Sequence, residues 1–189
     1  MFSSRTVKTS SSVRRATSSL LAALAAMAGC RGASSAPPAA LPVGVSLQAI
    51  GPPVDFSFSA LDGRAVSSEA TRGRPTVVTF VTTGSLPSQA QVDFLVAMAR
   101  NDADRVNYAA IALDSDEQRE LVEMYAKALS IPFPVALADD RTRAGASAFG
   151  DVSAVPVTVL LDRIGRVVWR VDGRVAKSAE IRAAIRSAR

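Results

Sequence analysis

Continuous apolar runs mark the central strands of this chain. The run PTVVTFVT (75–82) is apolar and rich in β-branched residues, which is typical of a strand covered on both faces. A second run, VNYAAIALD (106–114), predicts another buried strand, and IPFPVALADD (131–140) predicts a short third one. Inner strands of a mixed sheet are buried on both faces, so these runs indicate one central sheet.

Segments with helical spacing of apolar residues alternate with these strands. Pro87 suits the first turn of a helix, where its missing N–H costs nothing. Residues 115–118 (Ser-Asp-Glu-Gln) form a capping-box pattern that opens a second helix. A weak helix is expected through Ala146 and Phe149. The apolar residues of the three main helices are Val92, Leu95, Val96 and Ala99; Leu121, Met124, Tyr125 and Ala128; and Ile181, Ala184 and Ile185.

Two hairpin signals flank the alternating strands and helices. Phe56 and Phe58 alternate with polar residues before the turn pair Asp62-Gly63, which predicts an N-terminal hairpin. The segment 155–173 reads as two strands joined at residues 162–165. The fold class predicted from this order is α/β, a three-layer α/β/α domain with a central mixed β-sheet and an N-terminal β-hairpin.

The first thirty residues have the pattern of an export signal. A positive, acid-free stretch precedes the short apolar run LLAALAAMAGC (20–30), which is too short to span a bilayer. Its end, Met27-Ala28-Gly29-Cys30, resembles a bacterial lipobox, which implies cleavage before Cys30 and acylation of its thiol; an ordinary signal peptide with a chance Cys is the alternative. We expect a signal peptide over 1–29, a lipidated Cys and an Ala/Pro/Ser-rich tether over 30–50, and a domain over 51–189.

Composition excludes several classes of function. The formal net charge is +5, and the signal carries four basic residues and no acids, so subtracting these leaves about +1 and no case for nucleic-acid binding. The chain has one Cys and no His. A zinc or copper site of thiolates and imidazoles therefore lacks ligands, and a Ser-His or Cys-His nucleophile pair cannot form. We expect no metal and no cofactor.

Two separated phrases of the chain resemble the TlpA/ResA branch of thiol-disulfide oxidoreductases, which have the thioredoxin fold. The matching residues of the first phrase are Pro53, Asp55-Phe56, Leu61, Asp62-Gly63, Val66, Gly73, Val77-Val78 and Phe80. Those of the second are Val155-Pro156-Val157-Thr158-Val159-Leu160-Leu161-Asp162, Gly165 and Val167. The resemblance covers about residues 51–189 and implies a thioredoxin-like domain.

The chemistry of that family is missing at the matching positions. Its CxxC motif falls on Ser85-Leu86-Pro87-Ser88, so both cysteines are replaced, and Gly84 stands where the family has an aromatic residue. A serine hydroxyl is far less acidic than a thiol and cannot form a disulfide. We therefore expect no intact catalytic residue and interpret Ser85 as a helix cap. Ser88 with Gln91 is read as a second capping pair or as exposed polarity.

The resemblance also implies a substrate groove. Its residues here are Thr82, Gly84, Pro87, Val155 and Pro156, and Pro156 is expected to be cis and beside the Ser85–Ser88 turn. Thr82-Thr83-Gly84-Ser85 also resembles the peroxiredoxin Thr-x-x-Cys, but it lacks the same thiol. Asp139-Asp140 is read as a solvated loop and Trp169 as a core residue. The basic residues Arg163, Arg166, Arg170 and Arg174 are read as a solvated face.

Together these observations favour a membrane-anchored, thioredoxin-like protein of the bacterial cell envelope that faces the periplasm. We expect it to be redox-inactive, not an enzyme, and to bind a protein or peptide partner through the old substrate groove. The alternative is a TlpA-type oxidoreductase or an antioxidant protein of envelope redox homeostasis, because fold alone does not establish function.

Overall fold

A computed structural model describes residues 51–188 of the chain. The predicted signal peptide, the lipidated Cys30 and the tether lie outside the described residues, as does Arg189. No helix among the described residues has the length and apolar character needed to cross a membrane.

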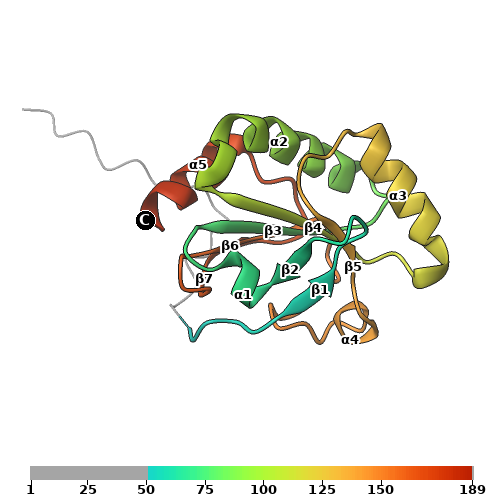
Figure 1. Ribbon diagram of the computed structural model, residues 1–189, viewed down its shortest axis with the longest axis horizontal. Coiled ribbons are helices and arrows are strands. Elements are labelled where there is room, and N and C mark those ends of the chain that lie inside the picture. Colours follow the sequence, from blue (N-terminus) through green and yellow to red (C-terminus); the bar gives the residue numbers. More distant parts are fainter. Residues whose placement is uncertain (1–50, 189) are drawn as a thin grey trace, which may run out of the picture. The chain divides into compact units, whose positions relative to one another are not determined.

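A five-stranded mixed sheet forms the centre of the fold (Figure 1). Its strands follow the order β5 (Val135–Leu137), β4 (Asn107–Ala112), β3 (Thr76–Val81), β6 (Val157–Leu161) and β7 (Val167–Val171). The strands β3, β4 and β5 are parallel, whereas β6 runs antiparallel to β3 and β7 antiparallel to β6. Every residue of β3 is buried, as its apolar run predicts, because it has a neighbour on each side and cover on each face.

The three long helices pack on one face of this sheet, above it in Figure 1. They are α2 (Leu86–Asp102), α3 (Arg119–Ala128) and α5 (Ser178–Ser187). A short 3₁₀ turn, η1 (Ala103–Arg105), follows α2, and another, η2 (Asp116–Gln118), carries the predicted capping box directly before α3. Trp169 is buried on this face, as predicted.

The opposite face is covered by the hairpin and two single-turn helices. The hairpin consists of β1 (Ser57–Ser59) and β2 (Ala65–Ser67), and the helices are α1 (Ser68–Thr71) and α4 (Asp140–Arg143). Phe56 and Phe58 pack with Phe80 and Phe149 at ring-centroid distances of 5.0–6.5 Å. These aromatic contacts hold the hairpin on the sheet, and the predicted α/β class with a central mixed sheet is confirmed.

Three local predictions need correction. The weak helix expected through Ala146 and Phe149 does not form; the helix lies earlier, at α4. Asp139 and Asp140 are exposed, as predicted, but they begin α4 instead of lying in a loop, and the Asp139 carboxylate caps the helix by accepting from the Thr142 N–H at 2.7 Å. Arg170 is buried rather than solvated, and its guanidinium donates to the carbonyl oxygens of Phe149 and Asp151.

Candidate functional site

The turn between β3 and α2 is built around Ser85. The Ser85 Oγ accepts from the Ser88 N–H at 3.3 Å, and the Ser85 carbonyl accepts from the Gln89 N–H at 3.0 Å. These are the bonds of an N-cap residue that satisfies a free donor in the first turn of a helix. The prediction that Ser85 is a cap is confirmed, because its hydroxyl oxygen accepts a backbone N–H of the helix.

Ser88 and Gln91 lie in the interior, so the prediction of a second capping pair or of exposed polarity is wrong for both. The side chains of Ser88 and Gln91 are fully buried. Ser88 Oγ accepts from the Thr82 N–H at 3.4 Å. Gln91 Oε1 accepts from the Ala176 N–H at 2.6 Å and thereby ties α2 to the segment before α5. Both polar groups face the core because they satisfy backbone donors there.

Asp114 holds the same turn from the end of β4, a role that the sequence reasoning missed. Both carboxylate oxygens accept from the Thr83 N–H, at 3.2 and 3.1 Å, and one accepts from the Thr83 hydroxyl at 2.5 Å. Asp114 is buried. The sequence did contain a signal for this role of Asp114. An acidic residue that follows a buried parallel strand lies beside the end of the neighbouring strand, which here is β3.

Pro156 lies at the same edge of the sheet. The Val155–Pro156 bond is cis, as predicted. Val157 pairs with Phe80, so Pro156 stands one residue beyond this pair, at the end of β3 where the Ser85 turn begins. The Pro156 carbonyl accepts from the Gly173 N–H at 3.1 Å.

An open groove of about 780 Å³ runs between this turn and α3. We call it the turn–α3 groove. Its lining residues are Thr82, Thr83, Gly84, Ser85, Asp114, Gln118, Leu121, Met124, Tyr125 and Ala128. Of the predicted site residues, Thr82, Gly84 and Ser85 are brought together here, whereas Pro87, Ser88, Val155 and Pro156 do not line it.

Tyr125 contributes a buried hydroxyl to the wall of the groove. Among the described residues it is the one buried side-chain oxygen or nitrogen with no hydrogen-bond partner. Burial, followed by the charges of Asp93 and Asp114, raises the pKa of Tyr125 to about 12. The phenol is therefore neutral at physiological pH.

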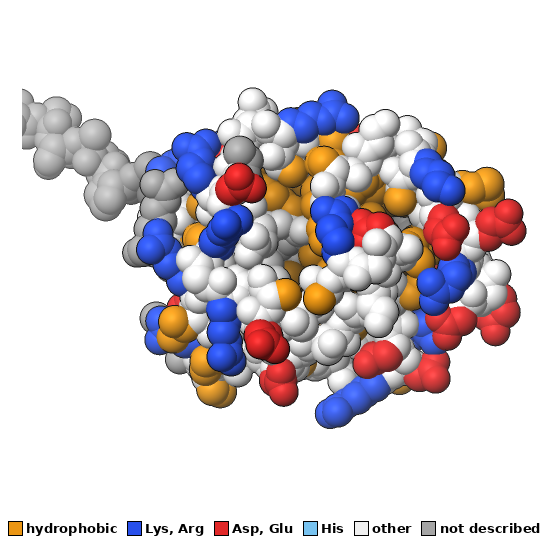
Figure 2. Space-filling view, viewed as in Figure 1, with side chains coloured by type: hydrophobic (Ala, Val, Ile, Leu, Met, Phe, Trp, Pro, Cys, Tyr) orange, Lys and Arg blue, Asp and Glu red, His pale blue; other side chains and the backbone are white. Residues whose placement is uncertain are grey.

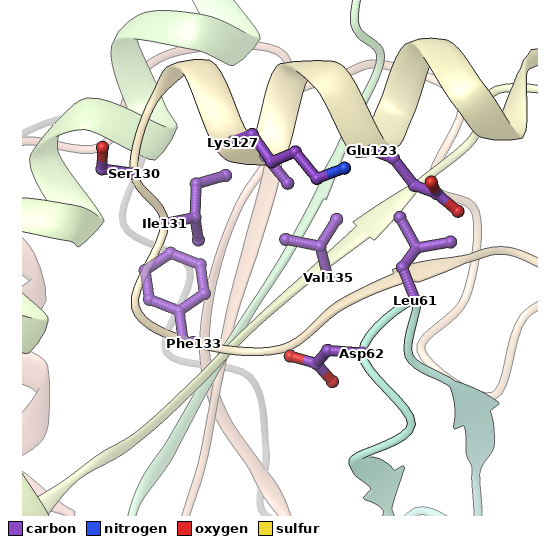
Figure 3. A pocket seen from close by; sticks show the side chains of 9 residues that line it. Leu61, Asp62, Glu123, Lys127, Ser130, Ile131, Phe133 and Val135 are labelled. Atoms are coloured by element: carbon purple, nitrogen blue, oxygen red, sulfur yellow. The ribbon is translucent and has the colours of Figure 1, made fainter.

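A second pocket of about 450 Å³ lies on the other side of α3 (Figure 3). Leu61, Ile131, Phe133 and Val135 form its apolar surface, and Glu123 and Lys127 extend over it from the helix. It contains none of the residues that the sequence marked as a site.

The arrangement at the turn offers no activated nucleophile. The hydroxyls of Ser85 and Ser88 accept backbone donors, and the full chain has no His to act as their base. The single Cys of the chain, Cys30, is outside the described residues.

Comparison with known proteins places this geometry in a family. The redoxin family model matches residues 47–185. No curated protein matches the chain. A solved structure described as a DsbF homologue from Corynebacterium diphtheriae has a TM-score of 0.65 at 18% identity, covering 76% of this chain and 92% of that one.

Two further structures share the fold. The first, a thiol:disulfide interchange protein of the thioredoxin family from Chlorobium tepidum TLS, has a TM-score of 0.61 at 24% identity, over 75% of this chain and 97% of that one. The second, a secreted Mycobacterium tuberculosis disulfide oxidoreductase homologous to E. coli DsbE, has a TM-score of 0.59 at 16% identity, over 70% and 96%. With its thioredoxin-like sheet and its match over residues 47–185, the chain belongs to the redoxin family.

Proposed function

We propose that this protein is a redox-inactive, lipid-anchored redoxin of the bacterial cell envelope that binds an extended segment of a partner protein. The observation that carries the proposal is the chemistry of the turn. Ser85, the N-cap of α2, and Ser88, in its first turn, stand three residues apart at the positions where the resemblance to TlpA and ResA expects the two cysteines, and their hydroxyls are engaged as acceptors.

The absence of thiols from the folded domain is what makes the protein redox-inactive. Thiol-disulfide exchange needs a thiolate to attack and a second thiol to resolve the mixed disulfide. Residues 31–189 contain no Cys, so neither group is available within the domain. The names of the similar structures favour the alternative function, an oxidoreductase. An insulin-reduction assay distinguishes an oxidoreductase from a redox-inactive protein.

Exposed apolar side chains around the turn support binding of a partner. Leu86 is 79% exposed, Met124 54% and Leu121 43%, and the last two line the turn–α3 groove. Large apolar side chains gathered at a groove are typical of interaction sites rather than of a plain solvated surface. An extended segment can place a side chain there without any covalent step.

We expect the full-length protein to bind an unfolded polypeptide and to leave insulin disulfides intact. The binding measurement compares a reduced, carboxymethylated polypeptide with its native form by fluorescence anisotropy, and the activity measurement follows insulin reduction with dithiothreitol. The proposal is supported if the protein binds only the unfolded form and if insulin is reduced no faster than by dithiothreitol alone. Catalysed reduction would establish the oxidoreductase instead, and no binding would remove the peptide-binding function.

Anchoring through Cys30 is part of the proposal. The motif Met27-Ala28-Gly29-Cys30 carries it, and a similar protein is described as secreted, which agrees with export. A buried acyl chain contributes about 0.8 kcal/mol per CH₂, so two or more chains hold a protein on a membrane.

We expect the wild-type protein to partition with the detergent phase and Cys30→Ser to partition with the aqueous phase. Both are expressed with the complete signal in a bacterial host and compared by detergent phase separation. Met98→Leu, which leaves the signal unchanged, is the matched control. A wild-type protein that stays entirely in the aqueous phase would contradict lipidation.

A further inference from the structure

The described chain begins at the end of the sheet that lies opposite the Ser85 turn. The Val54 N–H donates to the Gly165 carbonyl at 2.9 Å, so the chain enters the domain beside the turn between β6 and β7. Thr76, the first residue of β3, pairs with Leu161 at this end, whereas Ser85 follows the other end of β3. The six residues of β3 separate the two ends by about 20 Å.

Two loops meet where the chain enters, and both carry exposed arginines. The Gly73 N–H donates to the Arg163 carbonyl at 2.8 Å, which joins the loop before β3 to the β6–β7 turn. The side chains of Arg72, Arg74 and Arg163 are exposed. Ile164, next to Arg163 in the turn, is 52% exposed. We call the surface formed by Arg72, Arg74, Arg163 and Ile164 the tether face.

The three arginines of the tether face are not neutralised within the described part of the chain. No ion pair among residues 51–188 engages any of them. Asp162, which precedes the β6–β7 turn, pairs with Arg166 instead, at 2.8 Å. Glu69 and Asp104 lie near the loop before β3, but neither forms an ion pair with its arginines. The tether face therefore keeps a positive charge.

Further arginines extend the positive charge to the ends of α2 and α5. These are Arg100, Arg105, Arg182 and Arg186. Asp102 is shared by two of them, since it lies 3.3 Å from Arg182 and 4.0 Å from Arg105. At the other end of β4 the balance is reversed, because residues 114–123 contain five acids and one base, Arg119. In Figure 2 basic side chains gather at the left, where Figure 1 draws the end of α5, and most acidic side chains lie to the right.

We propose that the tether face rests on the anionic phospholipid surface of the membrane that holds the lipid anchor. Its arginines contact the headgroup phosphates, and Ile164 enters the boundary between the headgroups and the acyl chains. The inference rests on the proposed function, because it assumes the anchor at Cys30, and it adds the orientation of the domain. An acyl anchor and a basic surface reinforce each other in membrane binding. The Ser85 turn and the turn–α3 groove then face away from the membrane, toward the partner.

A fluorophore at either end of the domain measures this orientation in the anchored protein reconstituted into vesicles. Residues 31–189 contain no Cys, so Ile164→Cys and Leu86→Cys each provide one labelling site, and Leu86, next to the Ser85 turn, is 79% exposed. The vesicles consist of phosphatidylcholine with or without phosphatidylglycerol and contain a lipid with a spin-labelled headgroup, which quenches a nearby fluorophore. We expect quenching at position 164 to rise with phosphatidylglycerol and to fall in high salt, because salt screens the charges. Quenching at position 86 stays low in both kinds of vesicle.

A matched pair of double variants locates the attraction on the labelled Ile164→Cys protein. Arg72→Gln/Arg74→Gln removes two charges from the tether face. Arg119→Gln/Arg141→Gln removes two exposed arginines that also lack ion pairs, from α3 and α4, which follow the other ends of β4 and β5. Each arginine near an anionic surface changes the ratio of docked to free domain roughly fivefold, so the first pair should lower this ratio roughly twenty-five-fold. The second pair should leave it nearly unchanged.

The outcomes separate the orientation of the domain from its anchoring. Equal quenching at position 164 in both kinds of vesicle, or equal effects of the two double variants, overturns the inference and leaves the anchor in place. Stronger quenching at position 86 than at position 164 overturns it as well. In a flotation assay, a protein that floats with neither kind of vesicle lacks both the anchor and the attraction, whereas one that floats with anionic vesicles alone lacks only the anchor. The salt dependence at position 164 decides the role of charge even if a double variant does not fold.

Discussion

The double variant Ser85→Cys/Ser88→Cys is expected to form an intramolecular disulfide and to reduce insulin measurably, where the wild type does not. The two positions lie three residues apart, one as the N-cap and the other in the first turn of α2. A thiol at a helix N-terminus meets free N–H donors and the positive end of the helix dipole. Both effects stabilise the thiolate and lower the pKa of the cysteine at position 85.

The size of this effect can be estimated. If the pKa of that cysteine falls from about 8.5 to about 7.5, its thiolate fraction at pH 7 rises roughly eightfold. Reduction remains weak in comparison with the family's enzymes, because Gly84 replaces their aromatic residue. The reduced variant should also lose about 1–2 kcal/mol of unfolding free energy, since the Ser85 cap and the buried bond of the Ser88 hydroxyl are lost.

Single variants provide the controls. Ser85→Cys alone should react with a thiol reagent in the native state, because position 85 is partly exposed, and Ser88→Cys alone should be protected, because position 88 is fully buried. Neither should sustain turnover, since each lacks the second sulfur. Mass spectrometry and the insulin assay follow these results. A folded double variant without a disulfide would mean that Ser85 and Ser88 do not correspond to the two cysteines.

Asp114→Ala is expected to lower the free energy of unfolding by about 2–3 kcal/mol and to weaken peptide binding. The change leaves the N–H and hydroxyl of Thr83 without their acceptor at a partly buried site. Hydrogen bonds to a charged group contribute about 1.5–3 kcal/mol, and an unsatisfied buried donor costs about 1–3 kcal/mol. The turn that lines the groove then loses its attachment to β4.

Denaturant unfolding of two further variants checks the cause. Asp114→Asn keeps one acceptor oxygen for Thr83 and should recover about half of the loss. Asp116→Ala removes an exposed carboxylate two residues away, whose pair with Arg143 spans 3.5 Å, and should cost less than about 1 kcal/mol. Equal destabilisation by Asp114→Ala and Asp116→Ala would show that the contact with Thr83 does not stabilise the turn.

Local chemistry made much of the fold predictable. The run at β3 is buried at every residue because a strand with apolar residues on both faces is stable only when both are covered. The cap at Ser85 follows from a hydroxyl next to the free N–H groups of α2, and the hairpin turn after β6 includes Gly165 at a φ of 90°, a backbone conformation that favours glycine. Each of these depends on residues within a few positions of one another.

Polar residues with distant partners could not be placed in this way. Gln91 looks like surface polarity in the sequence, but its partner, Ala176, is 85 residues away and only the packing of α2 beside the segment before α5 brings them together. Asp114 and Thr83 are 31 residues apart and meet because β3 and β4 are parallel neighbours. Burial of such a group is stable only where a partner exists, and the partner is a property of the packing.

The same division holds for the candidate site. Residue types alone determined that the folded domain has no thiol and no imidazole, and short-range spacing determined that Ser85 and Ser88 open a helix after a buried strand. Tertiary structure alone decided which residues share the groove, because Leu121 and Met124 of α3 reach the turn only when both parallel strands end at one edge of the sheet.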